Sequence, residues 1–285
     1  MASNLTRCGK VLALALAALL PAGCEKIEQA ARADQANEAR QQAIQLIEAG
    51  ENAEALALLD RALALDPRDA AARFHRGLAR LNLGQLAEAV ADFTEALTLK
   101  PDDSRAHYNR GLALHKLGGL SAAVADYSEA IRLEPGLAPA YRNRGVAWAN
   151  MGMLGAALAD YDQALELGGP HHQVYQNRGK VFAALHRYAE AVADYDRSIR
   201  LHGDSEVFCD RGSAKAQLGD LATAIADFDT ALFLDHANGL AYLYRGLAKL
   251  RLGREAEGDD DIRRGLELRP DLRKPVEEVL PRAIV

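Results

Sequence analysis

The sequence predicts an all-α protein, a solenoid of about seven helix-turn-helix repeats. The main evidence is an Arg-Gly dipeptide that recurs six times, with successive glycines 34, 34, 34, 33 and 34 residues apart. A fixed period of this length is typical of stacked helical hairpins. The composition agrees, because alanine is abundant and only 6% of residues are aromatic, which favours close-packed helices over strands. The six dipeptides are Arg76-Gly77, Arg110-Gly111, Arg144-Gly145, Arg178-Gly179, Arg211-Gly212 and Arg245-Gly246.

Further markers place the two helices of each repeat. In the second helix a small residue, an aromatic residue and another small residue follow the spacing i, i+4, i+7, as Ala89, Phe93 and Ala96 do, and this spacing marks one helical face. Between the helices, seven residues after each Arg-Gly glycine, a second marker suits a sharp corner. These corner residues are Gly84, Gly118, Gly152, His186, Gly219 and Gly253. Prolines that end second helices are Pro67, Pro101, Pro135 and Pro270.

This pattern resembles the tetratricopeptide repeat, a 34-residue helix-turn-helix with small residues at its eighth, twentieth and twenty-seventh positions. The resemblance implies a right-handed α-solenoid over residues 36–271. The repeats are expected at about 36–69, 70–103, 104–137, 138–171, 172–204, 205–238 and 239–271. The first and last copies are degenerate, as capping repeats are. Residues 272–285 are expected to form a tail or a capping helix.

The N-terminus has the order of a secretory signal peptide over residues 1–23. Basic Arg7 and Lys10 precede an apolar run over residues 11–20, and small residues follow. Ten apolar residues span only about 15 Å as a helix, half of a bilayer core of about 30 Å, so a permanent transmembrane helix is the weaker interpretation.

Ala22-Gly23-Cys24 resembles the bacterial lipobox, although Pro21 stands where that motif has an aliphatic residue. The resemblance implies that Cys24 is lipidated and that residues 24–35 form a tether. The chain would then be anchored in the bacterial envelope and face the periplasm, with the inner or outer membrane left open. The alternative is an ordinary secretory peptide, whose cleavage leaves Cys24 as a free thiol.

An aspartate follows each Arg-Gly arginine after sixteen residues, which predicts a structural ladder of ion pairs. Positions seven and twenty-three of a hairpin lie at similar heights on opposing helices, so each pair can form within a repeat or between neighbours. The predicted pairs are Arg76 with Asp92, Arg110 with Asp126, Arg144 with Asp160, Arg178 with Asp194, Arg211 with Asp227, and Arg245 with Asp261.

Several function classes lack support in the sequence. The net charge is -6 and no strongly basic stretch stands out, which argues against nucleic acid as a partner. The histidines are scattered, and neither His-Glu-x-x-His nor Cys-x-x-Cys occurs, so no metal site is predicted. No cofactor motif or catalytic constellation is found, so no cofactor is expected and the chain is not expected to be an enzyme. Cys209 is expected to be a packed or groove-facing thiol rather than a nucleophile.

Function is expected on the concave face, which first helices line in the family that the sequence resembles. Positions two, five, nine, twelve and thirteen of each repeat usually point into it. The predicted groove residues are Phe74, Leu78, Asn82, Arg105, Tyr108, Lys116, Arg142, Asn150 and Lys180. Their mixture of apolar and basic groups suits a peptide segment, with the cations binding carboxylate or backbone groups. A merely solvated inner surface is the alternative.

Two functions fit these observations. The first is a periplasmic scaffold or adaptor that binds peptide segments of envelope enzymes or assembly factors. The second is a dedicated component of an envelope assembly machine, serving a pilus secretin or outer-membrane protein biogenesis. Solenoids commonly dimerise through terminal repeats, so a homodimer stays open.

Overall fold

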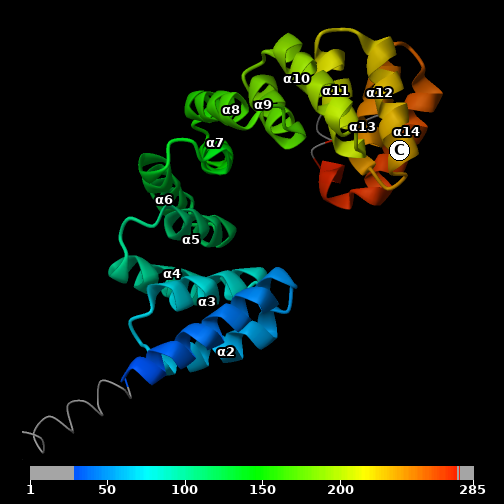
Figure 1. Ribbon diagram of the computed structural model, residues 1–285. Coiled ribbons are helices and arrows are strands. Elements are labelled where there is room, and N and C mark those ends of the chain that lie inside the picture. Colours follow the sequence, from blue (N-terminus) through cyan, green and yellow to red (C-terminus); the bar gives the residue numbers. More distant parts are fainter. Residues whose placement is uncertain (1–28, 275, 277–285) are drawn as a thin grey trace, which may run out of the picture. The chain divides into compact units, whose positions relative to one another are not determined.

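The fold is a succession of helical hairpins, seen in a computed structural model that describes residues 29–274 and residue 276 (Figure 1). All secondary structure in these residues is helical, so the all-α prediction is confirmed. The predicted signal peptide, Cys24 and residues 277–285 lie outside the described part. The first described segment is helical over residues 29–48. The later elements are α2 (Asn52–Leu65), α3 (Ala70–Asn82), α4 (Leu86–Leu99), α5 (Ser104–Lys116), α6 (Leu120–Leu133), α7 (Ala138–Asn150), α8 (Leu154–Gly168), α9 (His172–Ala184), α10 (Tyr188–Leu201), α11 (Ser205–Gln217), α12 (Leu221–Leu234), α13 (Gly239–Arg251), α14 (Glu255–Leu268) and the 3-10 turn η1 (Pro270–Leu272).

The chain divides into two compact units, Met1–Pro135 and Gly136–Val285. In the first unit the hairpins α3–α4 and α5–α6 pack in series after α2. In the second, α7–α8, α9–α10, α11–α12 and α13–α14 do the same. First helices of neighbouring hairpins also touch, α3 with α5 in the first unit, and α7 with α9, α9 with α11 and α11 with α13 in the second. The first helices of each unit therefore lie in one layer.

Small residues let the two helices of a hairpin approach closely. A Cβ added at Gly179 of α9 would lie 2.7 Å from Cε1 of Tyr195 in α10, which is closer than real Cβ contacts. The Tyr195 ring is buried, and Ala191 on the same face is buried too. The predicted small–aromatic–small face thus forms the core of the hairpin.

The corner between the helices requires a left-handed backbone. The glycines predicted to form it have φ between +75° and +87°, while His186 is the one non-glycine residue of the described part with positive φ, at 58°. Histidine tolerates this region better than most residues, at some cost relative to glycine. The corner prediction therefore holds for His186 as well as for the glycines.

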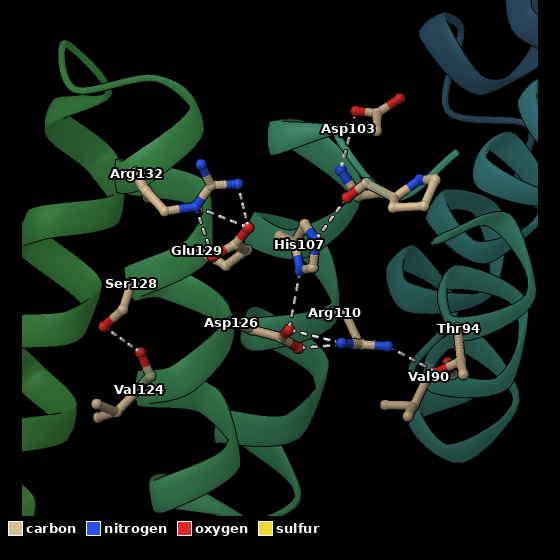
Figure 2. Close-up of polar contacts among 12 residues, drawn as sticks. Val90, Thr94, Asp103, His107, Arg110, Val124, Asp126, Ser128, Glu129 and Arg132 are labelled. Atoms are coloured by element: carbon tan, nitrogen blue, oxygen red, sulfur yellow. Dashed lines mark hydrogen bonds and ion pairs between the residues drawn. The ribbon is translucent and has the colours of Figure 1, made fainter. Parts of the chain in front are cut away.

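The structure joins every predicted arginine to its aspartate. The closest nitrogen–oxygen distances in the six pairs are 2.5–2.7 Å. Each pair links the two helices of one hairpin, and the aspartate side chains are nearly inaccessible, for example 1% exposed at Asp194. Figure 2 shows one rung, in which Asp126 accepts from Arg110 and also contacts His107 Nδ1 at 3.1 Å.

Several arginines also reach back to the preceding hairpin. Arg178 Nη1 lies 2.5 Å from Asp162 of α8, and Arg76 Nη1 lies 2.7 Å from Asp60 of α2. Arg110 instead donates to the hydroxyl of Thr94 at 3.2 Å (Figure 2). The ladder thus runs both within and between repeats. Some of its contacts between repeats are ion pairs, and that of Arg110 is a hydrogen bond to a neutral hydroxyl.

Candidate functional site

Phe74 is part of the core of the first unit, so its prediction as an accessible groove residue is wrong. It is 5% exposed, and its ring centroid lies 5.8 Å from that of Phe93 in α4. The Arg105 guanidinium lies over the ring, with its Cζ 5.3 Å from the ring centroid. The physical reason is that the ring is covered by Phe93 of its own hairpin and by Arg105 of the next one.

The other predicted residues of the first unit differ in accessibility. Asn82, Arg105 and Lys116 are exposed, whereas Leu78 and Tyr108 are half-buried. Asn82 donates to Asn52 Oδ1 at 2.9 Å, and Leu78 packs against the core cluster that contains Phe74. A cavity of about 80 Å³ beside Phe74 and Arg105 is too small for more than a minor group.

In the second unit, two of the three predicted residues line one cavity. Asn150 of α7 and Lys180 of α9 share a cavity of about 240 Å³ with Asn177. Arg142 does not line it; its Nη1 lies 3.0 Å from Nε2 of His171. Burial and the charge of Arg142 lower the pKa of His171. The structure therefore brings Asn150 and Lys180 together and places Arg142 against an imidazole.

Three adjoining cavities follow the first helices of the second unit, and we call them together the unit-2 groove. The α7–α9 cavity is the one just described. The α9–α13 cavity, of about 260 Å³, shares Lys180 with it. The α11–α13 cavity, of about 250 Å³, shares Ser213 and Tyr244 with the α9–α13 cavity. The groove therefore continues across four successive first helices.

The two ends of the groove differ in chemistry. The α11–α13 cavity has walls that are almost wholly apolar, including Phe228, Leu247 and Leu250. The α9–α13 cavity contains Lys180, Glu206 and Asp210, with Tyr188 and Tyr244 beside them. An apolar compartment thus adjoins a charged one.

Lys180 is already paired inside the groove. Its Nζ donates to Glu206 Oε1 at 2.5 Å and lies 3.6 Å from Asp210 Oδ2. Burial opposes the lysine charge, but the hydrogen bond to Glu206 and the charge of Asp210 outweigh it and raise the pKa of Lys180. Two acidic side chains thus pair with Lys180 in the structure, and its binding of a ligand carboxylate stays a prediction.

Asp210 lines the groove with one of its carboxylate oxygens left without a hydrogen bond. Its Oδ2 is buried and has no hydrogen-bond partner within the chain. Burial raises the pKa of its carboxyl, as does the charge of Glu206, while Lys180 and a hydrogen bond with Gln176 act in the opposite direction. A buried carboxylate oxygen without a hydrogen bond is costly, while the exposed 27% of the Asp210 side chain faces the α9–α13 cavity.

Sequence reasoning missed Asp210 and Tyr244, which both stand at the sixth repeat position. A signal existed, because the same position carries Asn109, Asn143 and Asn177 in three consecutive copies. A polar residue that recurs at one position of a helix indicates a position outside the apolar core.

Nothing in the described residues suggests a reactive or metal centre. Burial, reinforced by Asp210 and Glu206, raises the pKa of the Cys209 thiol to about 12, which keeps it protonated at neutral pH. Within residues 29–274, no group of three or more His, Cys, Asp or Glu side chains is arranged to hold a metal ion. The histidine pair 171–172 stacks at 5.4 Å between ring centroids without such a group.

Family models for the tetratricopeptide repeat match residues 41–108, 104–136, 143–206 and 209–271, which together are more than half of the chain. The chain belongs to the tetratricopeptide repeat family. Proteins of this family bind other proteins and are generally not catalytic. The chain is thus a tetratricopeptide protein-binding scaffold.

Solved structures of tetratricopeptide proteins share the fold at low sequence identity. PilF of Pseudomonas aeruginosa superposes with a TM-score of 0.63 at 19% identity, over 72% of this chain and 94% of its own. A tetratricopeptide repeat protein of Parabacteroides merdae superposes with a TM-score of 0.64 at 19% identity, over 88% of this chain and 100% of its own. YrrB, described as having an unusual peptide-binding site, superposes with a TM-score of 0.55 at 22% identity, over 63% of this chain and 93% of its own. No curated protein sequence matches the chain significantly.

The helices of the described part do not meet the requirements of a membrane span. None of them is both long enough and apolar enough to cross a bilayer.

Proposed function

We propose that this tetratricopeptide protein is an adaptor of the bacterial envelope that holds peptide segments of envelope enzymes or assembly factors in the unit-2 groove. The observation that carries the proposal is the continuity of three cavities along α7, α9, α11 and α13. Each has a volume below the roughly 300 Å³ at which pockets for small molecules begin. A row of side-chain-sized cavities suits an extended or helical peptide better than one compact ligand.

The envelope location in this proposal rests on the N-terminal sequence. The order of basic, apolar and small residues before Cys24 supports export and lipidation. Several acyl chains on Cys24 would hold the scaffold at the membrane, since each buried methylene contributes about 0.8 kcal/mol. The unit-2 groove would then face soluble proteins of the periplasm.

Affinity purification after in-cell crosslinking tests the groove. The parent chain is compared with a double variant, Asn150→Ala with Tyr244→Ala, because both side chains are accessible and line the groove. Phe233→Ala is the matched control, since this ring is 79% exposed and lines none of the three cavities. We expect the double variant to lose partners that the parent and control retain. Retention of every partner by the double variant would refute the groove assignment.

The same purification separates an adaptor from a machine component. An adaptor captures several soluble envelope proteins at modest affinity, whereas a machine component sits in one large stoichiometric complex.

Membrane fractionation of Cys24→Ser beside the parent tests the anchor. We expect the parent in the membrane fraction and the variant in the soluble fraction; a parent that is wholly soluble would contradict tethering.

A further inference from the structure

The charge of the α9–α13 cavity points to a ligand residue opposite in sign to the one that the sequence suggested. Lys180 is bound to Glu206 and lies beside Asp210, so it offers no free positive charge. The α9–α13 cavity holds one cation and two carboxylates among its lining residues and therefore has a net negative charge. This inference rests on the proposed function and specifies the chemistry of the bound segment.

Asp210 supplies the position at which a cation would bind. Its side chain is 27% exposed and lines the α9–α13 cavity, and its Oδ2 is 3.6 Å from the Lys180 ammonium, beyond ordinary hydrogen-bond length. Tyr188 and Tyr244 line the same cavity. Carboxylate oxygens and aromatic faces both attract ammonium and guanidinium groups. Neither feature favours a ligand carboxylate.

The adjoining cavity supplies an apolar anchor site. Phe228, Leu247 and Leu250 contribute to the α11–α13 cavity. Its 250 Å³ is sufficient for one large apolar side chain and too small for a folded element. Ser213 and Tyr244 belong to both cavities, so side chains that fill them must be close together in the bound segment.

We propose that the α9–α13 cavity makes the unit-2 groove prefer peptide segments with a lysine or arginine, which pairs with Asp210 while a neighbouring large apolar residue enters the α11–α13 cavity. The cationic residue pairs with the Asp210 carboxylate, which is partly exposed in the α9–α13 cavity. The apolar residue provides affinity through burial. Acidic segments are disfavoured, because they would bring a further negative charge towards Asp210 and Glu206.

Selection from a random dodecapeptide library displayed on phage, with the purified full chain immobilised, tests this proposal. We expect the retained peptides to be enriched in Lys or Arg next to Leu, Ile, Met or Phe. Enrichment in Asp or Glu overturns the charge preference and leaves the groove in place. If no peptide is retained in any round, the groove itself fails, and the proposed function fails with it.

Asp210→Asn then tests the contact itself, with affinities measured by fluorescence polarisation on the selected peptides. We expect the substitution to weaken a lysine-containing peptide about ten-fold or more, the usual effect of losing a charge-assisted hydrogen bond. It should leave nearly unchanged the affinity of the same peptide with Lys replaced by Gln. Equal losses for both peptides would overturn the pairing.

A matched measurement separates binding from folding. Burial raises the pKa of the Asp210 carboxyl, so at neutral pH its ionised form costs the folded state free energy. Asp210→Asn should therefore melt no lower than the parent while it binds cationic peptides less well. A lower melting temperature together with unchanged binding would show that Asp210 is structural and overturn the proposal.

Discussion

The Arg178 rung of the ladder allows a sharp test of the packing argument, because one arginine contacts two aspartates in different environments. Asp194 is 1% exposed and accepts from Arg178 at 2.6 and 2.8 Å and from Arg197 at 2.7 Å. Asp194→Asn keeps the shape and removes the charge. Removal of one partner of a buried ion pair costs about 3–5 kcal/mol. Arg178 keeps Asp162, so we expect the lower end, about 3 kcal/mol of unfolding free energy.

Asp162→Asn is the control, because Asp162 bonds to the same arginine at 2.5 Å but is 60% exposed. Exposed pairs contribute about 1 kcal/mol or less. Urea unfolding followed by far-ultraviolet circular dichroism measures both variants. Since repeat proteins can lose neighbouring hairpins separately, the transition that involves the second unit is the one to compare. Equal losses for the two variants would refute the claim that burial gives the rung its strength.

Three further outcomes follow from the described contacts. Gly179→Ala should lose about 1–3 kcal/mol of unfolding free energy by overpacking against Tyr195, whereas Gly155→Ala, where an added Cβ meets nothing within 4 Å, should gain up to about 1 kcal/mol; a thermal melt compares them, and a gain for both would contradict the close approach. Thr94→Asp should raise the free energy of unfolding by about 0.2–1 kcal/mol, because the new carboxylate gives Arg110 an ionic partner. Urea unfolding at low and high salt checks this, since salt should abolish the gain. The pKa of His171 is lowered in the folded protein, so the unfolded state takes up a proton at higher pH, and the free energy of unfolding should decrease as pH falls below the ordinary histidine value of 6.5. His171→Gln should flatten this decrease. An unchanged slope in the variant would exclude His171 as the cause.

The fold and the ladder are predictable from the sequence because repetition makes each requirement visible several times. A glycine such as Gly179 can be chosen for many reasons in one copy. Its recurrence opposite an aromatic residue leaves close helix packing as the explanation. The ladder is predictable for the same reason: Asp194 and its equivalents recur at one distance from an arginine, which only a contact between paired helices explains.

The groove could be predicted only in part, because its residues change from copy to copy. Phe74 occupies a position whose burial differs between copies, and only the packing against Phe93 of α4 and Arg105 of α5 shows that it is buried. Lys180 looks like a free cation until the structure places Glu206, one repeat later, within 2.5 Å. Asp210 and Tyr244 were missed because their importance comes from the cavity that they share with other helices.

Site-specific photocrosslinking in cells tests most directly the claim that partners bind in the unit-2 groove. A benzophenone amino acid replaces Tyr244, which lines two of the three cavities, and in a parallel strain it replaces Phe233, a similar aromatic residue outside them. We predict a defined adduct with another protein from position 244 and none from position 233. An adduct from position 233 alone would contradict the account and place the binding surface elsewhere.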